Sequence, residues 1–292
     1  MLSSAVLLAG CSPAAPADTD DQPVVLTTFT VIADMVREVA GNEVRVESIT
    51  KVGAEIHGYE PTPSDLVSAE SADLILDNGF GLERWFEDFV ARVDVPHVVL
   101  TDGIEPINIS TGEYEGKPNP HAWMSPIAGQ AYVENIAAAL SDLMPESADI
   151  FVANATEYEA RLQAVADDLV AAIDVLPAAQ RVLVTCEGAF SYLARDLGLT
   201  EGYLWPVNSD TQGTPQQIKA AIDLVRDRSV PAVFCETTVN DSSMQQVARE
   251  SGARYGGALF VDSLSEPGGP VPSYLELLRY DIDLIVAGLA DE

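Results

Sequence analysis

Basic residues are scarce in this chain. Among 292 residues, 15 lysines and arginines stand against 46 aspartates and glutamates, which gives a formal net charge of −31. Proteins that bind nucleic acid need clustered Lys and Arg to contact phosphates, so this charge excludes nucleic acid as a partner. It also argues against electrostatic adhesion to an anionic lipid surface. An acidic surface with few lysines keeps a protein soluble and equally suits a salty habitat.

Long hydrophobic runs are missing as well. No stretch approaches the roughly 18 consecutive apolar residues that a membrane-spanning helix needs. Hydrophobic residues nevertheless make up 47% of the chain, so it should fold around buried cores. Its length is enough for two lobes of ordinary domain size.

Cysteine is also rare, and the first of the three, Cys11, follows an apolar run that ends in small residues. This pattern resembles a bacterial lipoprotein signal, although the basic n-region of a signal peptide is missing. We expect residues 1–10 to be a signal segment that is removed, so that Cys11 becomes the lipidated first residue and anchors the protein to the membrane. Residues 11–23 are small, acidic and rich in proline, which is typical of a flexible tether. Cys186 and Cys235 each close an expected strand, and the sequence leaves open whether they form a disulfide or stay as buried thiols.

Only three histidines occur, and two of them lie in loops punctuated by glycine and proline. His57 and His121 each precede a helix-start signal, a capping Thr or Ser followed by Pro. A side chain on such a loop is held in place yet reachable by a ligand, and neutral imidazole is the commonest protein ligand of transition metals. Taken singly, each could be a surface or cleft-wall histidine, but the two together favour a metal site. The third, His97, lies in a strand-like run and is expected in the core or at a sheet edge.

From residue 24 onward, short β-rich runs alternate with amphipathic stretches, which indicates parallel βαβ units. Expected strands cover residues 24–28, 44–49, 74–78, 97–100, 181–185, 232–235 and 258–261. Expected helices cover residues 31–40, 62–68, 82–91, 126–142, 147–175, 189–197, 215–226, 242–251 and 273–289. The longest of these helices has apolar residues at helical spacing and would extend roughly 40 Å at 1.5 Å per residue, enough to span both lobes.

The pattern therefore predicts an α/β protein with two Rossmann-like lobes, each built on a parallel sheet. The N-terminal lobe is expected over residues 24–146, a rigid linking helix over 147–176 and the C-terminal lobe over 177–292. Ligands of such folds bind at the carboxyl ends of the strands, so the cleft between the lobes is the expected site.

Two acidic residues of the second half fall at expected strand ends. Glu187 follows the strand 181–185 at a strand-to-helix junction, and Asp262 follows the strand 258–261. Each could equally be a capping or first-turn residue. Their location selects them, because carboxylates at strand ends of the second lobe would face the two loop histidines of the first.

Five segments carry a resemblance to a known family. They are His57–Asp65, Ala72–Gly79, Asn119–Trp123, Cys186–Phe190 and Phe260–Ser263. Together they resemble the metal-binding lipoproteins of bacterial manganese/zinc ABC importers, over residues 24–290. The resemblance implies that two lobes, joined by one rigid helix, hold one metal ion between two histidines of the first lobe and two further ligands of the second.

On this resemblance the metal ligands are His57, His121, Glu187 and Asp262. The implied function is capture of a divalent metal outside the cytoplasmic membrane and its delivery to an ABC permease by a lipid-anchored monomer. When the protein docks on the permease, movement of the second lobe would separate the histidine pair from the carboxylates.

The expected metal is Mn²⁺, with Zn²⁺ or Fe²⁺ as alternatives. Members of the family devoted to zinc often have a histidine-rich loop between the first two ligands and a histidine as the third ligand. Here that segment holds only His97 and the third position is Glu187. Two imidazoles and two carboxylates neutralise a divalent ion and offer oxygen donors that suit Mn²⁺ or Fe²⁺. Zn²⁺ still binds more tightly to almost any such set, so selectivity must come from geometry and supply.

The sequence gives less support to other classes of function. A metal-dependent hydrolase would need an open coordination position and a general base, and the sequence has no HExxH or Ser-His-Asp arrangement, so an enzyme is not expected. In an adhesin or structural lipoprotein, the histidines and acids would be incidental. Of the residues near the expected ligands, Trp123 should pack near the His121 loop, and Glu60 and Asp65 should serve the start of a helix. Glu236 is left outside the site.

Overall fold

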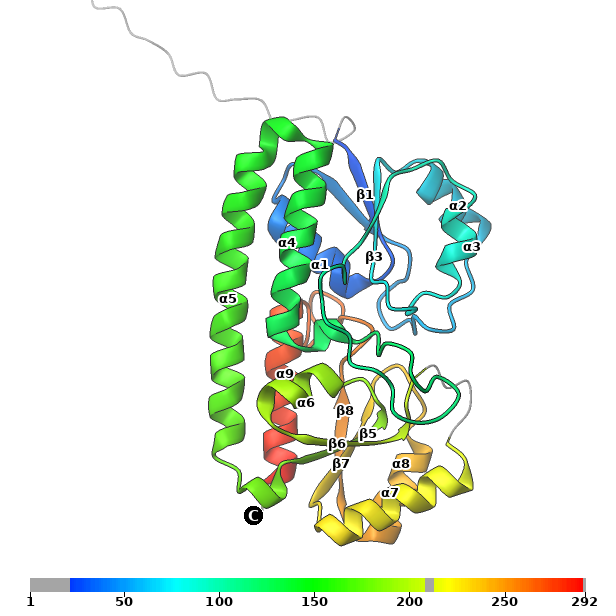
Figure 1. Cartoon of the computed structure of the whole chain (residues 1–292), viewed down its shortest axis with the longest axis vertical. Coiled ribbons are helices and arrows are strands. Elements are labelled where there is room, and N and C mark those ends of the chain that lie inside the picture. Colours follow the sequence, from blue (N-terminus) through cyan, green and yellow to red (C-terminus); the bar gives the residue numbers. More distant parts are fainter. Residues whose placement is uncertain (1–21, 208–212, 291–292) are drawn as a thin grey trace, which may run out of the picture.

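The computed structural model describes residues 22–207 and 213–290 (Figure 1). The expected signal segment, Cys11 and all but the last two residues of the expected tether lie outside the described residues. Within the described ranges, no helix is both long and apolar enough to cross a membrane.

The first half is a four-stranded parallel sheet with strand order β2-β1-β3-β4. Its elements are β1 (Val24–Thr27), α1 (Thr30–Ala40), β2 (Arg45–Ser48), α2 (Pro63–Glu70), β3 (Leu74–Asp77), α3 (Phe86–Val90) and β4 (His97–Val99). The central strands β1 and β3 are buried along their whole length, as expected of a parallel sheet covered on both faces. Alternate residues of β1 face different clusters: Val25 packs into the main core, whereas Val24 and Leu26 join a smaller cluster with α2 and α3.

The second half contains two parallel strand pairs. Their elements are β5 (Val182–Glu187), α6 (Ser191–Leu197), β6 (Thr200–Trp205), α7 (Pro215–Arg228), β7 (Ala232–Glu236), α8 (Ser242–Ser251), β8 (Arg254–Leu259) and α9 (Tyr274–Leu289). β5 pairs with β6, and β7 with β8. A disulfide between Cys186 and Cys235, with 4.8 Å between their Cα atoms, joins β5 to β7 and answers the question that the sequence left open.

Two long helices connect the halves. α4 (Pro126–Leu143) and α5 (Ala148–Asp174) lie side by side, and α5 runs along the whole length of the molecule (Figure 1). The short helices η2 (Ala122–Met124) and η3 (Pro145–Ser147) precede them, and η4 (Ala178–Gln180) follows α5. The 27 residues of α5 bury a helical stripe that consists of Phe151, Ala155, Tyr158, Leu162, Val165, Ala166, Leu169 and Ile173. One continuous hydrophobic core therefore extends from the first half into the second.

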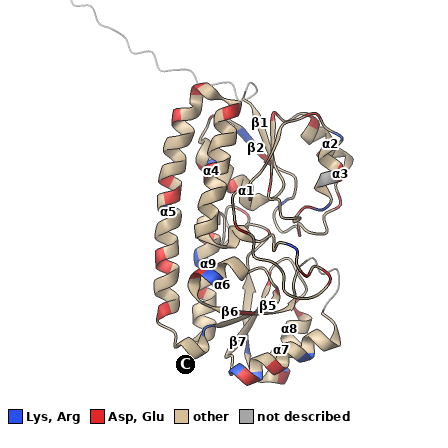
Figure 2. Ribbon diagram, in the orientation of Figure 1, with Lys and Arg blue, Asp and Glu red and all other residues tan. Residues whose placement is uncertain are grey.

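Acidic residues occur on elements of both halves. Figure 2 shows them along α5 and on other helices. The net charge is thus not confined to one element.

The structure differs from the expected elements at three places. α3 begins at Phe86, because the preceding turn wraps around Glu83, whose buried carboxylate accepts the N–H of Asn78 and the hydroxyl of Thr28. β6 was not expected. β8 begins at Arg254 and ends at Leu259, since its glycines are required by packing: a Cβ at Gly256 would lie 2.3 Å from the ring of Phe234.

The shift of β8 changes the position of Asp262 relative to that strand. Asp262 lies three residues beyond the last residue of β8, so the expectation that it directly follows the strand is wrong. Glu187, in contrast, is the last residue of β5. His97 lies on the edge strand β4 with a side chain 42% exposed, which confirms the expected edge position.

Candidate metal site

Four side chains converge where the two halves meet. The Nε2 atom of His57 lies 3.1 Å from Nε2 of His121, 3.4 Å from Oε1 of Glu187 and 4.0 Å from Oδ1 of Asp262. Donor atoms that each lie about 2.1 Å from one metal ion are roughly 3–4 Å from one another. The structure therefore brings together the four residues that the sequence singled out, since His121, Glu187 and Asp262 each have a donor atom within 4.0 Å of Nε2 of His57.

These side chains are almost completely buried. Those of His57, Glu187 and Asp262 are 4%, 3% and 1% exposed, and His121 is fully buried. Donor atoms of His57, His121 and Asp262 all lie within 4.8 Å of one another. Within the described part of the chain, Oδ1 of Asp262 has no hydrogen-bond partner. A buried carboxylate oxygen without a partner is costly unless a cation is bound there, so the residues fit a divalent metal ion.

Electrostatics favour the same interpretation. Burial, together with the charge of Glu55, raises the pKa of Asp262 to about 7, although a hydrogen bond from the Thr238 hydroxyl opposes this shift. Burial also lowers the pKa of His121 well below its usual value, and the nearby His57 lowers it further. The imidazole of His121 is therefore neutral at pH 7, the form that binds metal.

The loop between β2 and α2 positions His57. The N–H groups of His57 and Gly58 donate to the two oxygens of the Glu55 carboxylate, at 2.7 and 2.8 Å. The indole of Trp85 donates to the carbonyl of Ile56 at 3.0 Å. The main chain is thus fixed on both sides of the imidazole.

Helix-start residues complete this loop. Asp65 accepts the N–H of Thr62 and the hydroxyl of Tyr59, and the Thr62–Asp65 capping box begins α2. This confirms the expected role of Asp65. Glu60 is exposed.

His121 lies at the start of η2 and is held by the side chain of Asn119, two positions earlier in the chain. The Oδ1 atom of Asn119 accepts the N–H of His121 at 3.0 Å and lies 2.9 Å from its Nδ1. Trp123 packs against the imidazole with ring centroids 5.0 Å apart, as expected from the sequence. Asn119 belongs to the segment Asn119–Trp123 that carries the family resemblance, but no pattern in the sequence predicts its contact with His121.

Glu187 is supported from within the second half. Its N–H lies 3.2 Å from both carboxylate oxygens of Glu236, which is itself buried. Burial raises the pKa of Glu236 to about 8. A Cβ at Gly188 would lie 2.8 Å from the carbonyl oxygen of Pro206, so glycine is required directly after Glu187. Glu236, which the sequence analysis left out, thus holds the main chain of a candidate ligand.

Cys186 and Cys235 lie close to Glu236, and the three could in principle bind a metal. The two sulfurs are bonded to each other and are therefore unavailable as thiolate donors. Successive residues of a strand face opposite sides, which directs Cys186 away from the side that Glu187 faces.

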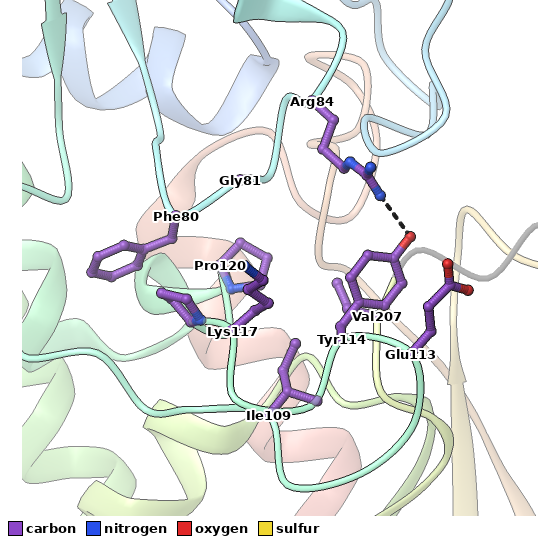
Figure 3. A pocket seen from close by; sticks show the side chains of 10 residues that line it. Phe80, Gly81, Arg84, Ile109, Glu113, Tyr114, Lys117, Pro120 and Val207 are labelled. Carbon is purple, nitrogen blue, oxygen red and sulfur yellow. Dashed lines mark hydrogen bonds between the residues drawn. The ribbon is translucent and has the colours of Figure 1, made fainter.

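A separate cavity of about 590 Å³ lies next to Pro120 (Figure 3). It is lined by Phe80, Gly81, Arg84, Ile109, Glu113, Tyr114, Lys117, Pro118, Pro120 and Val207. The guanidinium of Arg84 donates to the hydroxyl of Tyr114 across it, at 2.9 Å. None of the four candidate ligands is among these lining residues, so the cavity is distinct from the metal site.

Comparisons with known proteins agree with this geometry. Residues 25–288 match the family described as zinc-uptake complex component A, periplasmic (ZnuA). The chain is 49% identical to the iron-binding protein YfeA of Yersinia pestis, over 98% of this chain and 92% of that protein. It is 32% identical to the manganese ABC transporter substrate-binding lipoprotein PsaA of Streptococcus pneumoniae, over 98% of this chain and 96% of that protein. Among solved structures, the Mn-bound periplasmic metal-binding protein of Candidatus Liberibacter asiaticus is 38% identical, with a TM-score of 0.86 over 92% of this chain and 100% of that one.

Proposed function

This chain belongs to the ZnuA family of periplasmic metal-uptake components, and from that membership we propose that it captures Mn²⁺ outside the cytoplasmic membrane and delivers it to an ABC permease. The observation that carries this proposal is that buried donor atoms of His121, Glu187 and Asp262 lie within 4.0 Å of Nε2 of His57. An ion bound there would be enclosed by four protein ligands, which suits capture and transport better than catalysis, because a catalytic metal keeps a position open for water or substrate.

The choice of Mn²⁺ rests on the donor atoms. Two carboxylates supply oxygen ligands and can bind through both oxygens, which raises the coordination number above the four that zinc prefers. A relative is named for manganese and another for iron, while the family is named for zinc, so Zn²⁺ and Fe²⁺ uptake by the same site are the alternatives.

Lipidation of Cys11 would hold the protein at the extracytoplasmic face of the membrane, close to the permease. The acidic tether 11–23 would let the folded part reach its partner while anchored. We expect it to act as a monomer, since one chain supplies all four candidate ligands.

Equilibrium dialysis of metal-free protein tests the proposal. The wild type should bind about one Mn²⁺ per chain, and His57→Ala should abolish binding because the site loses a donor that lies close to the other three. His97→Ala is the matched control: this imidazole is half-exposed on β4 and outside the site, so the substitution should leave binding intact. A folded wild type that binds neither Mn²⁺, Fe²⁺ nor Zn²⁺ would instead support a structural lipoprotein.

A further inference from the structure

A single buried amide contacts both halves of the candidate site. Asn119 is 3% exposed. Its Oδ1 accepts the N–H of His121 and lies 2.9 Å from the Nδ1 atom of that imidazole. Its Nδ2 donates to the carbonyl of Gly188 at 2.6 Å and to the hydroxyl of Ser191 at 3.2 Å. Gly188 directly follows Glu187, so one side chain joins the neighbourhoods of two candidate ligands, one from each half.

The orientation of this amide is fixed by backbone groups. A main-chain N–H can only donate, so the N–H of His121 requires the oxygen of Asn119 on its side. A main-chain carbonyl can only accept, so Gly188 requires the nitrogen on the other side. With Oδ1 facing Nδ1 of His121, that ring nitrogen must carry the proton. The lone pair of the neutral ring is then on Nε2, the atom that faces His57 across 3.1 Å.

The main chain of Asn119 is also held by the second half. The hydroxyl of Tyr192 on α6 donates to the carbonyl of Asn119 at 2.8 Å and accepts the N–H of Ile107 at 3.1 Å. The segment 107–119 is therefore held by α6. Any movement that separates Gly188 from His121 must stretch or break the contacts at one end of the Asn119 amide.

We propose that Asn119 is a positioning residue that keeps His121 in its metal-binding tautomer while the halves are in contact, and so couples their separation to release of the ion. This inference rests on the proposed function, since it concerns the same site. A ligating imidazole depends on the partner of its other nitrogen for orientation and basicity, and loss of such a partner typically weakens metal binding about 10–100-fold.

Three variants test it. Asn119→Ala removes both contacts, whereas Asn119→Asp keeps an oxygen for the Nδ1–H of His121 but places a second acceptor against the Gly188 carbonyl. Asn135→Ala is the matched control, because the side-chain amide of Asn135 on α4 likewise donates two hydrogen bonds, here to the carbonyls of Leu100 and Asp102, away from the site. Thermal unfolding checks that each variant folds.

Two measurements give the result. Free Mn²⁺ measured by electron paramagnetic resonance should show Asn119→Ala binding about 10–100-fold more weakly than wild type, with Asn135→Ala unchanged. Nitrogen-15 NMR of the metal-free proteins should show His121 protonated on Nδ1 in the wild type and in Asn119→Asp, and a mixture of tautomers in Asn119→Ala. Stopped-flow chelation should show faster Mn²⁺ release from Asn119→Asp than from wild type, since the contact with Gly188 is lost.

The inference would be overturned by a folded Asn119→Ala that binds Mn²⁺ within twofold of wild type, or by a wild-type His121 protonated on Nε2. A wild type that binds no metal would refute the proposed function instead. The tautomer of His121, measured without metal, would still decide the role of Asn119.

Discussion

The indole nitrogen of Trp123 donates to the main-chain carbonyl of Val261, the residue before Asp262, across 3.1 Å and 138 positions of sequence. The residues after Asp262 are held from the same side: Gly53 donates its N–H to the Ser263 hydroxyl at 2.7 Å, and the hydroxyl of Thr30 accepts the N–H of Leu264. The segment that carries Asp262 is thus attached to the first half of the molecule, although it follows β8 of the second.

These contacts change which candidate ligands are expected to separate when the metal ion is released. The sequence predicts that opening separates the two histidines from both carboxylates. In the structure Asp262 is held largely by first-half residues, with Thr238 as its side-chain contact in the second half. Glu187 is held by Glu236 within the second half. We therefore expect Glu187 to leave the other three ligands when the halves separate.

Trp123→Phe should weaken Mn²⁺ binding and should also lower the stability of the folded state. The substitution leaves the buried carbonyl of Val261 without its donor, which costs about 1–3 kcal/mol, and it frees the Asp262 segment. Chemical denaturation and Mn²⁺ titration of the same preparation measure the two effects. Unchanged Mn²⁺ affinity in a destabilised variant would show that the attachment of this segment does not serve the site.

Glu187→His should shift the metal preference toward zinc. The change replaces a carboxylate by a single nitrogen donor, and three nitrogens with one oxygen suit four-coordinate Zn²⁺, so the ratio of Zn²⁺ to Mn²⁺ affinity should rise about tenfold or more. Competition titrations with a chelating dye measure it. Glu60→His makes the same replacement at an exposed position of the His57 loop and should leave the ratio alone. Equal ratios in the two variants would argue against Glu187 as a ligand.

Removing the disulfide should destabilise the second half without abolishing metal binding. Cys186 and Cys235 are 49 residues apart, and closing a loop of that size stabilises a fold by about 4 kcal/mol in the chain-entropy estimate. The double variant Cys186→Ala/Cys235→Ala should unfold at lower temperature than wild type and become insensitive to reducing agents. Calorimetry with and without a phosphine reductant tests this. A wild type whose melting temperature does not respond to the reductant under unfolding conditions would contradict it.

Asp34→Asn should stabilise the protein above pH 6. Burial raises the pKa of Asp34 from 3.8 to about 6, although it accepts the N–H of Tyr274 at the start of α9. The folded state therefore holds this proton more tightly than the unfolded state, and stability falls as the pH rises from about 4 through 6. Asparagine keeps the acceptor oxygen and never ionises. The free energy of unfolding of the variant should therefore exceed that of wild type by an amount that grows from near zero at pH 4 to at most about 3 kcal/mol above pH 6.

Urea unfolding of Asp34→Asn and wild type at several pH values measures this advantage. The control is Asp168→Asn, the same substitution on the exposed side of α5. If the free energies of unfolding of Asp34→Asn and wild type differ by the same amount at all pH values, ionisation of Asp34 is not the cause of the difference.

Local patterns in the sequence were enough to predict much of the architecture. Capping residues and prolines located the starts of α2, α4 and α7, and the apolar spacing of α5 located the helix that connects the halves. Strands with unusual composition were harder to predict. β6 reads Thr-Glu-Gly-Tyr-Leu-Trp, and β8 includes two glycines that only the folded structure explains: Gly256 packs against the ring of Phe234, and Gly257 has a φ of 124°.

The candidate ligands were easier to predict than the residues that hold them in place through hydrogen bonds. His57 and His121 lie on loops, and Glu187 and Asp262 lie at or near strand ends, which sequence pattern can locate. Asn119 and Glu236 act through hydrogen bonds to Gly188 and Glu187, 69 and 49 positions away. The spacing of residues along the sequence does not reveal such contacts, because they depend on how the two halves are packed together.

The bridged cysteines also bear on the donor atoms that this part of the molecule offers to a metal. Monovalent copper prefers thiolate ligands, and two reduced thiols at residues 186 and 235 would supply them beside Glu236. Bonded to each other, the two sulfurs cannot act as thiolates. The disulfide therefore leaves carboxylate oxygens, and no thiolate sulfur, at the ends of β5 and β7.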